Sequence, residues 1–326
     1  MASKTFVLGA GYSVAAGFPL VRNLRSEVLE FAQTTTDPLL RMLIDPKIPE
    51  YPSGQFLEEI QAVDPSGSMG FEELLLALRR VKRGGPAWAV PHFLRSSCAK
   101  LLWAKQDAIR VLPDSYLNFA SWMNELHGVG RRNAVVSLNW ELLVERAFQD
   151  QGVPWGYSTR SPVPVIKPHG SINWSRHRQE GLRADCNALQ SISERSPYSY
   201  IPSDPIDPSS IGPFSDLFRD GVNADLGHMI FPGDPEDEEG VTQIWREAEQ
   251  VIQERDVVIF IGYSLPPYDA PARDFFRRIA KGKTVEVYTD SAYVLDSYRN
   301  FLALANVVTA RPIKFESCPY ALDRFT

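Results

Sequence analysis

Residues suited to nucleotide chemistry follow the first β-strand-like segment of this sequence. Gly9, Gly11 and Ser13 come directly after an apolar segment at 5–8 and before a helical pattern at 19–31. Backbone amides in such a loop can face a pyrophosphate, and glycine lets the phosphate come close. The spacing departs from the usual G-x-G-x-x-G. The loop therefore indicates a dinucleotide site, with an ordinary tight strand-to-helix turn as the alternative.

Polar residues also follow three later apolar segments, which are predicted to be strands. They are Asn139 and Glu141 after 134–137, His169 after 163–167, and Ser264 after 257–261. Gly262 also follows the last of these segments. Open α/β sheets bind ligands at the carboxyl ends of their strands, so these side chains are expected to meet in one crevice. Each also has a purely structural reading, namely Asn139 as a helix cap, His169 as a turn histidine and Ser264 as a turn former.

Composition limits the classes of protein to consider. The chain has 326 residues, and 34 Lys and Arg against 40 Asp and Glu give a net charge of −6. A nucleic-acid-binding surface needs clustered basic residues, so no direct nucleic acid binding is expected. Its 3 cysteines, at 98, 186 and 318, are far apart, which argues against a disulfide framework or a zinc site. The cysteine usage fits a reducing cytoplasm.

No membrane association is expected either. The longest uninterrupted apolar run spans only 257–261, whereas a membrane-spanning helix needs about 20 such residues. The N-terminal stretch could pass for a secretory signal, but glycines and a proline interrupt it. A buried strand that leads into a glycine-rich loop is the preferred interpretation.

Alternating strands and helices predict an α/β fold with a parallel sheet covered by helices on both faces. A further strand is expected at 285–288. Residues 35–130 lose the strand pattern and are interpreted as a helical insertion. Residues 175–240, rich in Pro, Ser and Asp, are interpreted as an irregular insertion that serves as a lid or as a mobile surface excursion.

Four ordered motifs resemble those of the sirtuin family. GAGYSVAAGFPLVR resembles the family's nucleotide loop, SLNWELL its T-x-N-x-D-x-L segment, KPHGS its histidine segment and DVVIFIGYSLP its strand ending in G-T-S-L. The resemblance implies a Rossmann-like NAD-binding domain formed by 1–34 and 131–326. It leaves both insertions unexplained.

Two departures narrow the resemblance. Sirtuin deacetylases carry four zinc-binding cysteines after the histidine segment, whereas only Cys186 lies between His169 and Cys318 here. HGSINW and GYSLPPYD look more like the sirtuin-like NAD hydrolases of bacterial anti-phage defence, which lack the zinc module. The other departure is Glu141, which stands where the family usually has Asp and leaves the catalytic rate open.

The resemblance implies cleavage of the nicotinamide–ribose bond of NAD, with NAD as the substrate and no metal. His169 would act as general base, Asn139 would orient the ribose or the attacking water, and Glu141 would orient ribose hydroxyls or offset positive charge. The residues expected to hold the dinucleotide are Gly9, Ala10, Gly11, Ser13, Pro19, Arg22, Gly262, Ser264 and Asp290. Arg22 is ambiguous, because a surface salt bridge is the equal alternative to a phosphate contact.

An enzyme that destroys NAD must be restrained in an undisturbed cell. We therefore expect a toxic effector of a defence system, activated by a partner protein or by assembly into a homo-oligomer. Two other classes stay open. One is a sensor that binds NAD or ADP-ribose without turnover, and the other is a zinc-free deacylase or ADP-ribosyltransferase.

Overall fold

The computed structural model describes most of the chain outside its longest irregular segment. The described residues are 2–35, 55–81, 89–172, 174–177, 181–184, 229, 239–289, 291–302 and 306–309. Asp290 and most of the expected irregular insertion at 175–240 lie outside them.

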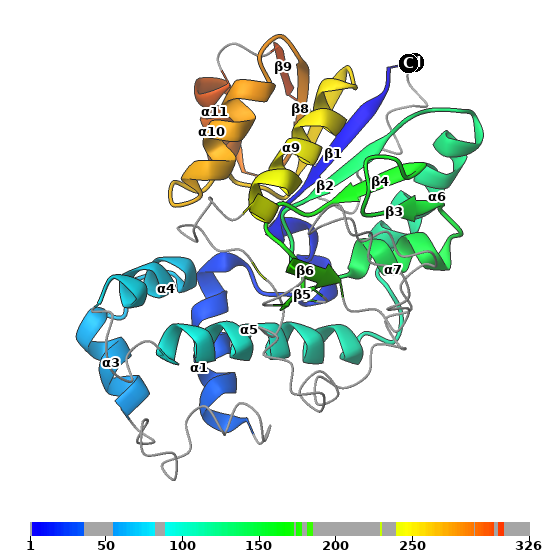
Figure 1. Ribbon diagram of the computed structural model, residues 1–326. Coiled ribbons are helices and arrows are strands. Elements are labelled where there is room, and N and C mark those ends of the chain that lie inside the picture. The colour runs from blue at the N-terminus through cyan, green and yellow to red at the C-terminus, as the bar shows by residue number, and fades with distance from the viewer. Residues whose placement is uncertain are drawn as a thin grey trace.

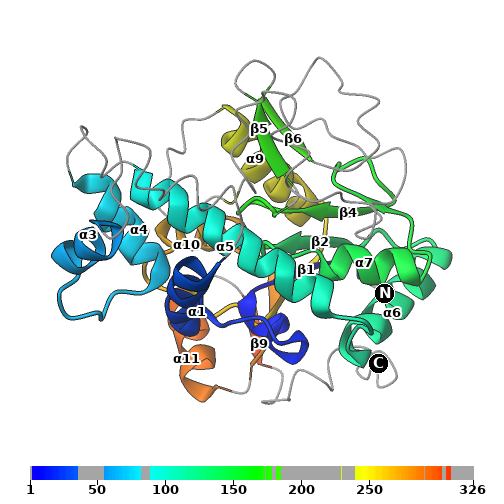
Figure 2. The ribbon, with the colours of Figure 1, turned by 90° about the horizontal axis from the view of Figure 1, so that it is seen from below.

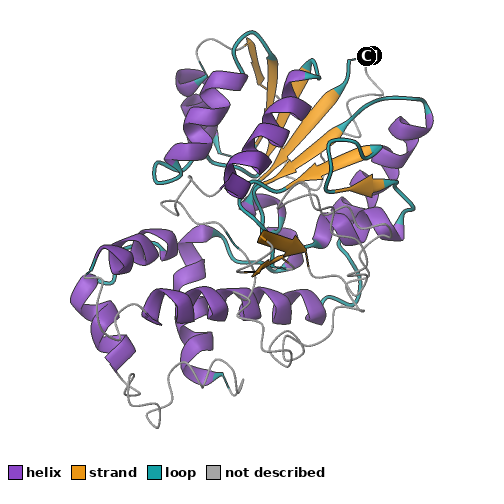
Figure 3. Cartoon of the chain, in the orientation of Figure 1, coloured by secondary structure: helices purple, strands orange, loops and turns teal. Residues whose placement is uncertain are grey.

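A sheet of seven strands forms the centre of the fold, and every pair of neighbours in it is parallel. It is the orange fan in the upper half of Figure 3. In spatial order the strands are β3 (Trp155–Gly156), β4 (Val163–Ile166), β2 (Ala134–Ser137), β1 (Lys4–Leu8), β7 (Val257–Ile261), β8 (Thr284–Tyr288) and β9 (Asn306–Thr309).

The strand order is that of a doubly wound nucleotide-binding sheet. Leaving aside the two-residue edge strand β3, the chain order across the sheet runs 3-2-1-4-5-6. The order reverses at β1, which pairs with β2 on one side and β7 on the other. A crevice for a ligand is expected outside the carboxyl ends of the strands at such a point.

Helices cover both faces of the sheet, as predicted. Phe6 meets Phe119 and Trp122 of α6 (Asp114–Gly128), with ring centroids 5.3 and 5.2 Å away. Its neighbour Thr5 donates from Oγ1 to Val251 O of α9 (Glu239–Gln253) at 3.2 Å. Successive strand residues point to opposite faces, so α6 and α9 lie on opposite faces. This confirms the predicted α/β class.

The other helices that accompany the sheet follow their strands in the chain. They are α7 (Leu143–Asp150), which packs on α6, α10 (Ala270–Ile279), which packs on α9, and α11 (Ala292–Phe301), beside β9. The sheet needs helices on both faces because all residues of β7, VVIFI, are buried. Figure 1 shows α9, α10 and α11 around the β7–β9 half of the sheet.

A helical part lies below the sheet in Figure 1 and in front of it in Figure 2. It consists of α1 (Val21–Thr34), α3 (Gln55–Val63), α4 (Phe71–Arg80) and α5 (Ala89–Ala108). One face of α4 is apolar and packs inward, with Phe71, Leu74, Leu75 and Leu78 all buried.

Within this helical part, Arg25 of α1 binds the loop before α4. Its guanidinium pairs with Asp64 and donates to Met69 O at 2.7 Å. Asp64 in turn accepts the Met69 amide at 3.0 Å. The pairing with Arg25 and these hydrogen bonds outweigh burial and hold the pKa of Asp64 at about 2. The loop therefore has a fixed position beside α1.

The division into domains stays a prediction. The predicted helical insertion at 35–130 contains α3 to α6, and α6 packs on the sheet through Phe119 and Trp122. Within 175–240 the structure describes the hairpin strand β6 (Gly181–Ala184), paired with β5 (Trp174–His177). No described helix is long and apolar enough to cross a membrane.

Candidate functional site

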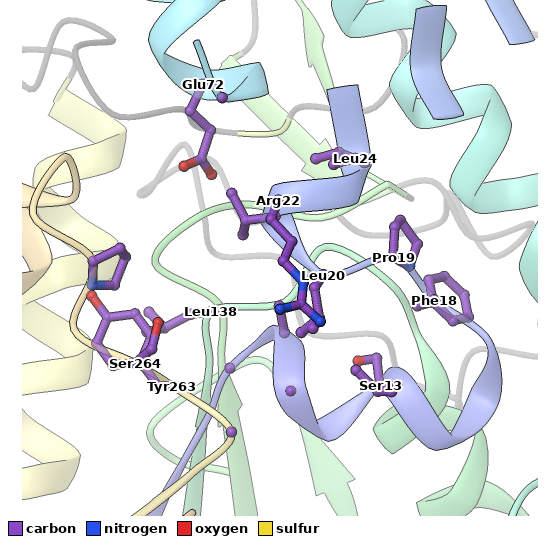
Figure 4. A pocket seen from close by; sticks show the side chains of 18 of the residues that line it. Ser13, Phe18, Pro19, Leu20, Arg22, Leu24, Glu72, Leu138, Tyr263 and Ser264 are labelled. Atoms are coloured by element: carbon purple, nitrogen blue, oxygen red, sulfur yellow. The ribbon is translucent and has the colours of Figure 1, made fainter. Parts of the chain in front are cut away.

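A large pocket opens where the strand order reverses. Its volume is about 1290 Å³, and its walls come from the loops after β1, β2, β4 and β7 and from α1 and α4. Figure 4 shows these loops converging from the strand ends below, with α4 above. All the predicted site residues that the structure describes line this pocket, namely Gly9, Ala10, Gly11, Ser13, Pro19, Arg22, Asn139, Glu141, His169, Gly262 and Ser264. Asp290 lies outside the described residues.

The glycines after β1 lie against the backbone of the loop after β7. The amides of Gly9 and Gly11 donate to Ile261 O and Gly262 O, both at 2.9 Å. A Cβ at Gly9 would lie 2.6 Å from Tyr263 Cα, and one at Gly11 would lie 2.9 Å from Gly262 Cα. Glycine is therefore required at both positions, because two loop backbones touch there.

Most of the loop's amides are also already bonded. Besides Gly9 and Gly11, the amide of Ser13 donates to Ala10 O at 3.1 Å, within two short 3₁₀ turns. Within the described part of the chain, the amides of Ala10 and Val14 donate to no group. These two amides are the donors of the loop that a ligand could take. The helix α1 begins only at Val21, so its N-terminus does not adjoin the glycines.

Asn139 ties the loop after β2 to the loop after β1. Its Nδ2 lies 3.1 Å from Gly9 O, 3.0 Å from Ser13 Oγ and 3.1 Å from Glu141 Oε1. The Ser13 hydroxyl donates to the same Glu141 oxygen. All of these polar side chains are buried. The side-chain amide is therefore held by its partners in one orientation, with its carbonyl oxygen left to other donors.

The Glu141 carboxyl group is satisfied from within the protein. Its Oε2 accepts the Leu143 amide at 2.9 Å, and its Oε1 accepts from Ser13 and Asn139. Burial raises the pKa of Glu141, and the nearby ammonium group of Lys167 offsets part of that rise. A positive charge in the pocket would therefore favour the ionised form.

A buried ion pair supports this loop from beneath. Lys167, at the end of β4, donates to Glu141 O at 2.6 Å and to Glu145 Oε1 at 2.9 Å. The Tyr157 hydroxyl also donates to Glu145 Oε1, at 3.1 Å. The side chains of Lys167 and Glu145 are 0% and 1% exposed, so the pair is shielded from water and fixes the backbone of Glu141.

His169 heads a second polar chain on another wall of the pocket. Its Nε2 lies 3.5 Å from Asp269 Oδ1, and Asp269 Oδ2 accepts from the Tyr263 hydroxyl at 2.7 Å. Burial lowers the pKa of His169, but Asp269 more than compensates, and the pKa is raised. Burial raises the pKa of Asp269, but His169 and Tyr263 outweigh it, and the pKa is lowered. The Asp269 carboxylate therefore makes the His169 imidazole a stronger base than it would be in water.

Tryptophan side chains fix the loop that carries His169. Trp140 Nε1 donates to His169 O at 2.8 Å, and the Ile172 amide donates to Trp140 O at 2.9 Å. Trp103 of α5 donates to Ile172 O at 3.2 Å. The loops after β2 and β4 are thus bonded to each other, which sets the position of His169 relative to Asn139.

The loop after β7 has an unusual backbone. Gly262 has φ = 67°, and a Cβ there would lie 2.4 Å from Tyr12 N. Leu265 also has a positive φ, 53°, which is a strained conformation for a residue of its shape and is typical of functional loops. Ser264 is exposed in the pocket between them.

Arg22 lies at the mouth of the pocket on α1. Figure 4 shows its guanidinium extending across the centre of the view, above Ser13. It is exposed, and no described carboxylate forms an ion pair with it. Of the two alternatives for Arg22, the salt bridge with a described residue is therefore not formed. Pro19 lines the pocket just before α1.

Comparisons with known proteins bear on the fold. No family model and no curated protein matches the chain. Among solved structures it is similar to a Sir2 homologue in complex with NAD, at 15% identity over 97% of this chain and 86% of that one, with a TM-score of 0.42.

Two further structures are similar to the same extent. A mutant Sir2 homologue in complex with ADP-ribose is 13% identical over 97% of this chain and 88% of that one, with a TM-score of 0.41. Sir2 with the inhibitor EX-527, 2′-O-acetyl-ADP-ribose and a deacetylated peptide is 14% identical over 97% and 90%, with a TM-score of 0.42. Likenesses at these values do not assign the chain to a family.

The sequence prediction assigned no role to two residues of the site, although Asp269 is the last residue of the GYSLPPYD motif. Asp269 and Glu72 both line the pocket, and both are buried. The only sequence pattern that could have indicated Glu72 is its position three residues before Leu75, at the edge of the apolar face of α4. Asp269 follows the predicted loop after β7 closely, but nothing in the sequence pairs it with His169.

A resident metal has no donor set in the described part of the chain. No group of three or more His, Cys, Asp or Glu side chains there could hold an ion. Cys98 is buried in α5, where burial raises the pKa of its thiol, and Cys186 and Cys318 lie outside the described residues.

Proposed function

We propose that this protein hydrolyses NAD⁺ at the bond between nicotinamide and ribose, giving nicotinamide and ADP-ribose. One observation carries the proposal. Asn139 and His169, from the ends of two different strands, line a single pocket with the Gly9–Ser13 loop, at the reversal point of a 3-2-1-4-5-6 sheet. That is where such sheets bind dinucleotides.

The reaction needs a nucleophile, a base and stabilisation of positive charge. Water attacks C1′ of the ribose while the C–N bond breaks, the bonding electrons leave with nicotinamide, and the water gives up one proton. His169 would accept that proton, directly or through a ribose hydroxyl. Because Asp269 raises the pKa of His169, the imidazolium that results would be stabilised by the neighbouring carboxylate.

Asn139 and Glu141 would act on the ribose. The carbonyl oxygen of Asn139 accepts no hydrogen bond from a described residue and can hold water or a ribose hydroxyl. The ionised Glu141 carboxylate would offset the positive charge of the sugar as nicotinamide departs. Both groups are held by protein partners before any ligand arrives, so little reorganisation is needed.

The diphosphate would lie against the loop after β1. The amides of Ala10 and Val14, the guanidinium of Arg22 and the exposed hydroxyl of Ser264 are the donors available there. Arg22 is suited to bidentate contact with phosphate oxygens. Asp290 remains the candidate for the adenosine ribose.

Purified protein incubated with NAD⁺ tests this function. We expect nicotinamide release, with a loss of 100-fold or more in rate for His169→Ala and Asn139→Ala, the order of magnitude for general acid–base groups. His127→Ala, at a half-buried position of α6, and Asn300→Ala, at an exposed position of α11, are the matched controls. Undiminished release by both site variants contradicts the assigned residues. Binding of NAD⁺ with no release under any condition selects the sensor alternative.

We further propose that the enzyme acts in the cytoplasm as the toxic effector of a bacterial anti-phage defence system. The HGSINW and GYSLPPYD motifs support this, because they resemble those of defence NAD hydrolases. A partner protein or assembly into a homo-oligomer would release the activity. In a bacterial host, phage challenge should deplete NAD with the wild type and not with His169→Ala. Full activity of an isolated monomer contradicts the need for a trigger.

A further inference from the structure

Glu72 presents a buried carboxyl group to the pocket from the helical part of the chain. The residue is 8% exposed and lines the pocket with His169 and Asp269. In Figure 4 its side chain descends from α4 toward the pocket. Its Oε2 is buried and has no hydrogen-bond partner among the residues that the structure describes. Buried polar atoms nearly always have a partner, so this one requires an explanation.

Several titratable groups face Glu72 from the elements around it. Asp269, His169 and Tyr268 face it from the strand-end loops, Cys98 from α5, and Glu73 is its neighbour on α4. Burial raises the pKa of Glu72 to about 8, Asp269 adds to the rise, and His169 and Tyr268 oppose it. The protein alone therefore keeps Glu72 protonated at neutral pH.

The two glutamates of the pocket differ in what satisfies them. Glu141 receives hydrogen bonds from Ser13, Asn139 and the Leu143 amide, so the protein itself supports its charge. Glu72 has no such support at Oε2. A buried carboxylate needs an opposite charge or hydrogen-bond donors nearby. Tyr268 and His169 offset only part of the rise in the pKa of Glu72, so a ligand in the pocket can supply the partner that Oε2 lacks.

Resting on the proposed function, we infer that Glu72 makes the pocket selective for the positively charged pyridinium form of the dinucleotide. The reduced dihydropyridine form has no positive charge on its nicotinamide ring, and ADP-ribose has no such ring. Among these three ligands, only the oxidised form can supply a positive charge to the buried Oε2. Glu72 is thus a specificity-determining residue, contributed by α4 rather than by the sheet.

This role links ligand binding to proton release. A cation within about 4–6 Å of a carboxyl group lowers its pKa by about 1–3 units. Glu72 would give up its proton when the pyridinium form binds, and the affinity for that form would rise with pH until the pH passes about 8, the pKa of free Glu72. His169 also faces Glu72 and has a raised pKa, so a Glu72 variant is needed to assign the extra pH dependence to Glu72.

Calorimetric titration with three ligands tests the inference. The probes are the non-hydrolysable carbocyclic analogue of NAD⁺, its reduced dihydropyridine form and ADP-ribose. Between about pH 6 and about pH 8 we expect the affinity of the cationic analogue to rise by up to about tenfold per pH unit relative to the other two. Repeating the titration in buffers of different ionisation enthalpy measures the released proton directly, in the wild-type protein.

Variants on α4 separate Glu72 from its surroundings. Glu72→Gln should lower the affinity for the cationic analogue at about pH 9 by about tenfold or more and remove its extra pH dependence, leaving ADP-ribose binding within about twofold. Glu73→Gln makes the same change one residue along, on the exposed side of the helix. It should neither lower the affinity for the cationic analogue nor remove its extra pH dependence.

The outcomes separate this inference from the proposed function. Binding of all three ligands with one common pH dependence and no extra proton release by the cationic analogue overturns the role of Glu72 while leaving the hydrolase intact. Failure of both the analogue and ADP-ribose to bind overturns the proposed function. If Glu72→Gln does not fold, extra proton release that persists in His169→Ala supports the role of Glu72, and its loss in that variant overturns the inference.

Discussion

Asp269 Oδ1 lies 3.5 Å from His169 Nε2, although the two residues are 100 positions apart in the sequence and belong to loops after different strands. Asp269 is itself held by the Tyr263 hydroxyl at 2.7 Å and lies at the start of α10. The carboxylate controls both the orientation of the imidazole and its protonation. The relationship therefore sets the pH range in which His169 can act as a base.

Asp269→Asn should shift the pH dependence of nicotinamide release. Asp269 raises the pKa of His169, and its removal leaves burial, which lowers that pKa. The limb of the pH–rate profile on which activity rises should therefore move to lower pH. The maximal rate should fall by about tenfold to 100-fold, because the imidazole loses its orienting partner. Profiles of kcat and kcat/KM between about pH 5 and about pH 9 measure both effects.

Tyr263→Phe provides the comparison for Asp269. It removes the hydroxyl that donates to Asp269 and leaves the carboxylate in place. A small shift in the same profile is expected, since His169 keeps its charged neighbour. A shift equal to that of Asp269→Asn would assign the effect to packing rather than to the carboxylate.

Gly11→Ala should destabilise the protein because of the contact between the loops after β1 and β7. The added Cβ would lie 2.9 Å from Gly262 Cα and 3.0 Å from Gly262 O, which are backbone atoms with little freedom to move. Overpacking of this kind costs about 1–3 kcal/mol, so the midpoint of urea unfolding should fall. The pocket wall would also shift, and ligand affinity should drop.

Gly128→Ala is the matched substitution at the end of α6. Nothing lies within 4 Å of a Cβ there, and the backbone is not in the left-handed region. We expect stability to be unchanged or raised by up to about 1 kcal/mol. Equal unfolding midpoints for the two variants would contradict the close contact at Gly11.

The sequence was sufficient for most of the sheet and for part of the site. β1, β2, β4, β7 and β8 were predicted because continuous buried runs of β-branched residues are unambiguous, and the polar residues after them converge as expected. Trp155–Gly156 and Asn306–Thr309 were missed, because such short edge strands have little hydrophobic pattern.

Long-range pairings account for what the sequence did not reveal. Gly9 and Gly11 were predicted to clear space for a phosphate, and their close contacts with Tyr263 and Gly262, more than 250 residues away, were not foreseen. Glu72 lies in a helix that shows only an apolar face and charged flanks in the sequence. Whether a flank faces water or a pocket depends on tertiary packing, which local pattern does not contain.

Lys167→Met should strongly destabilise the protein by leaving Glu145 buried without its partner. Breaking one side of a buried ion pair costs about 3–5 kcal/mol. Lys167 also holds Glu141 O at 2.6 Å, so nicotinamide release should fall as well. Chemical denaturation and the rate assay on the folded fraction measure the two effects separately.

The double variant Lys167→Met with Glu145→Gln tests the cause. Without the Glu145 charge, the uncompensated carboxylate disappears, and the Tyr157 hydroxyl can still donate to the new side chain. Stability should therefore recover in part relative to Lys167→Met alone. Additive losses from the two changes would contradict a direct interaction between these residues.

The protein should lose stability as the pH rises from 4.5 to about 8, and Glu72 should cause much of the loss. Its pKa is raised from 4.5 to about 8 by burial and by Asp269. A carboxyl group with a raised pKa binds its proton more tightly in the folded state. Its stabilising contribution is complete below the unfolded pKa and disappears as the pH rises through the folded one.

His169 contributes in the same direction, because its raised pKa also favours the protonated form in the folded state. Its stabilisation is present below its ordinary pKa of 6.5 and is lost as the pH rises through the raised value. Asp269 acts oppositely. The stabilisation that comes from its lowered pKa is complete above the ordinary value of 3.8 and is lost only in stronger acid.

Glu72→Gln separates these contributions. The variant cannot ionise, so its unfolding free energy should fall by less between about pH 5 and about pH 9 than that of the wild type, the difference being on the order of a few kcal/mol. Glu73→Gln, exposed on the same helix, should follow the wild-type curve. Chemical denaturation at each pH measures the free energies. Parallel curves for the wild type and Glu72→Gln would mean that Glu72 ionises near its ordinary pKa, because water or a cation already reaches its buried Oε2.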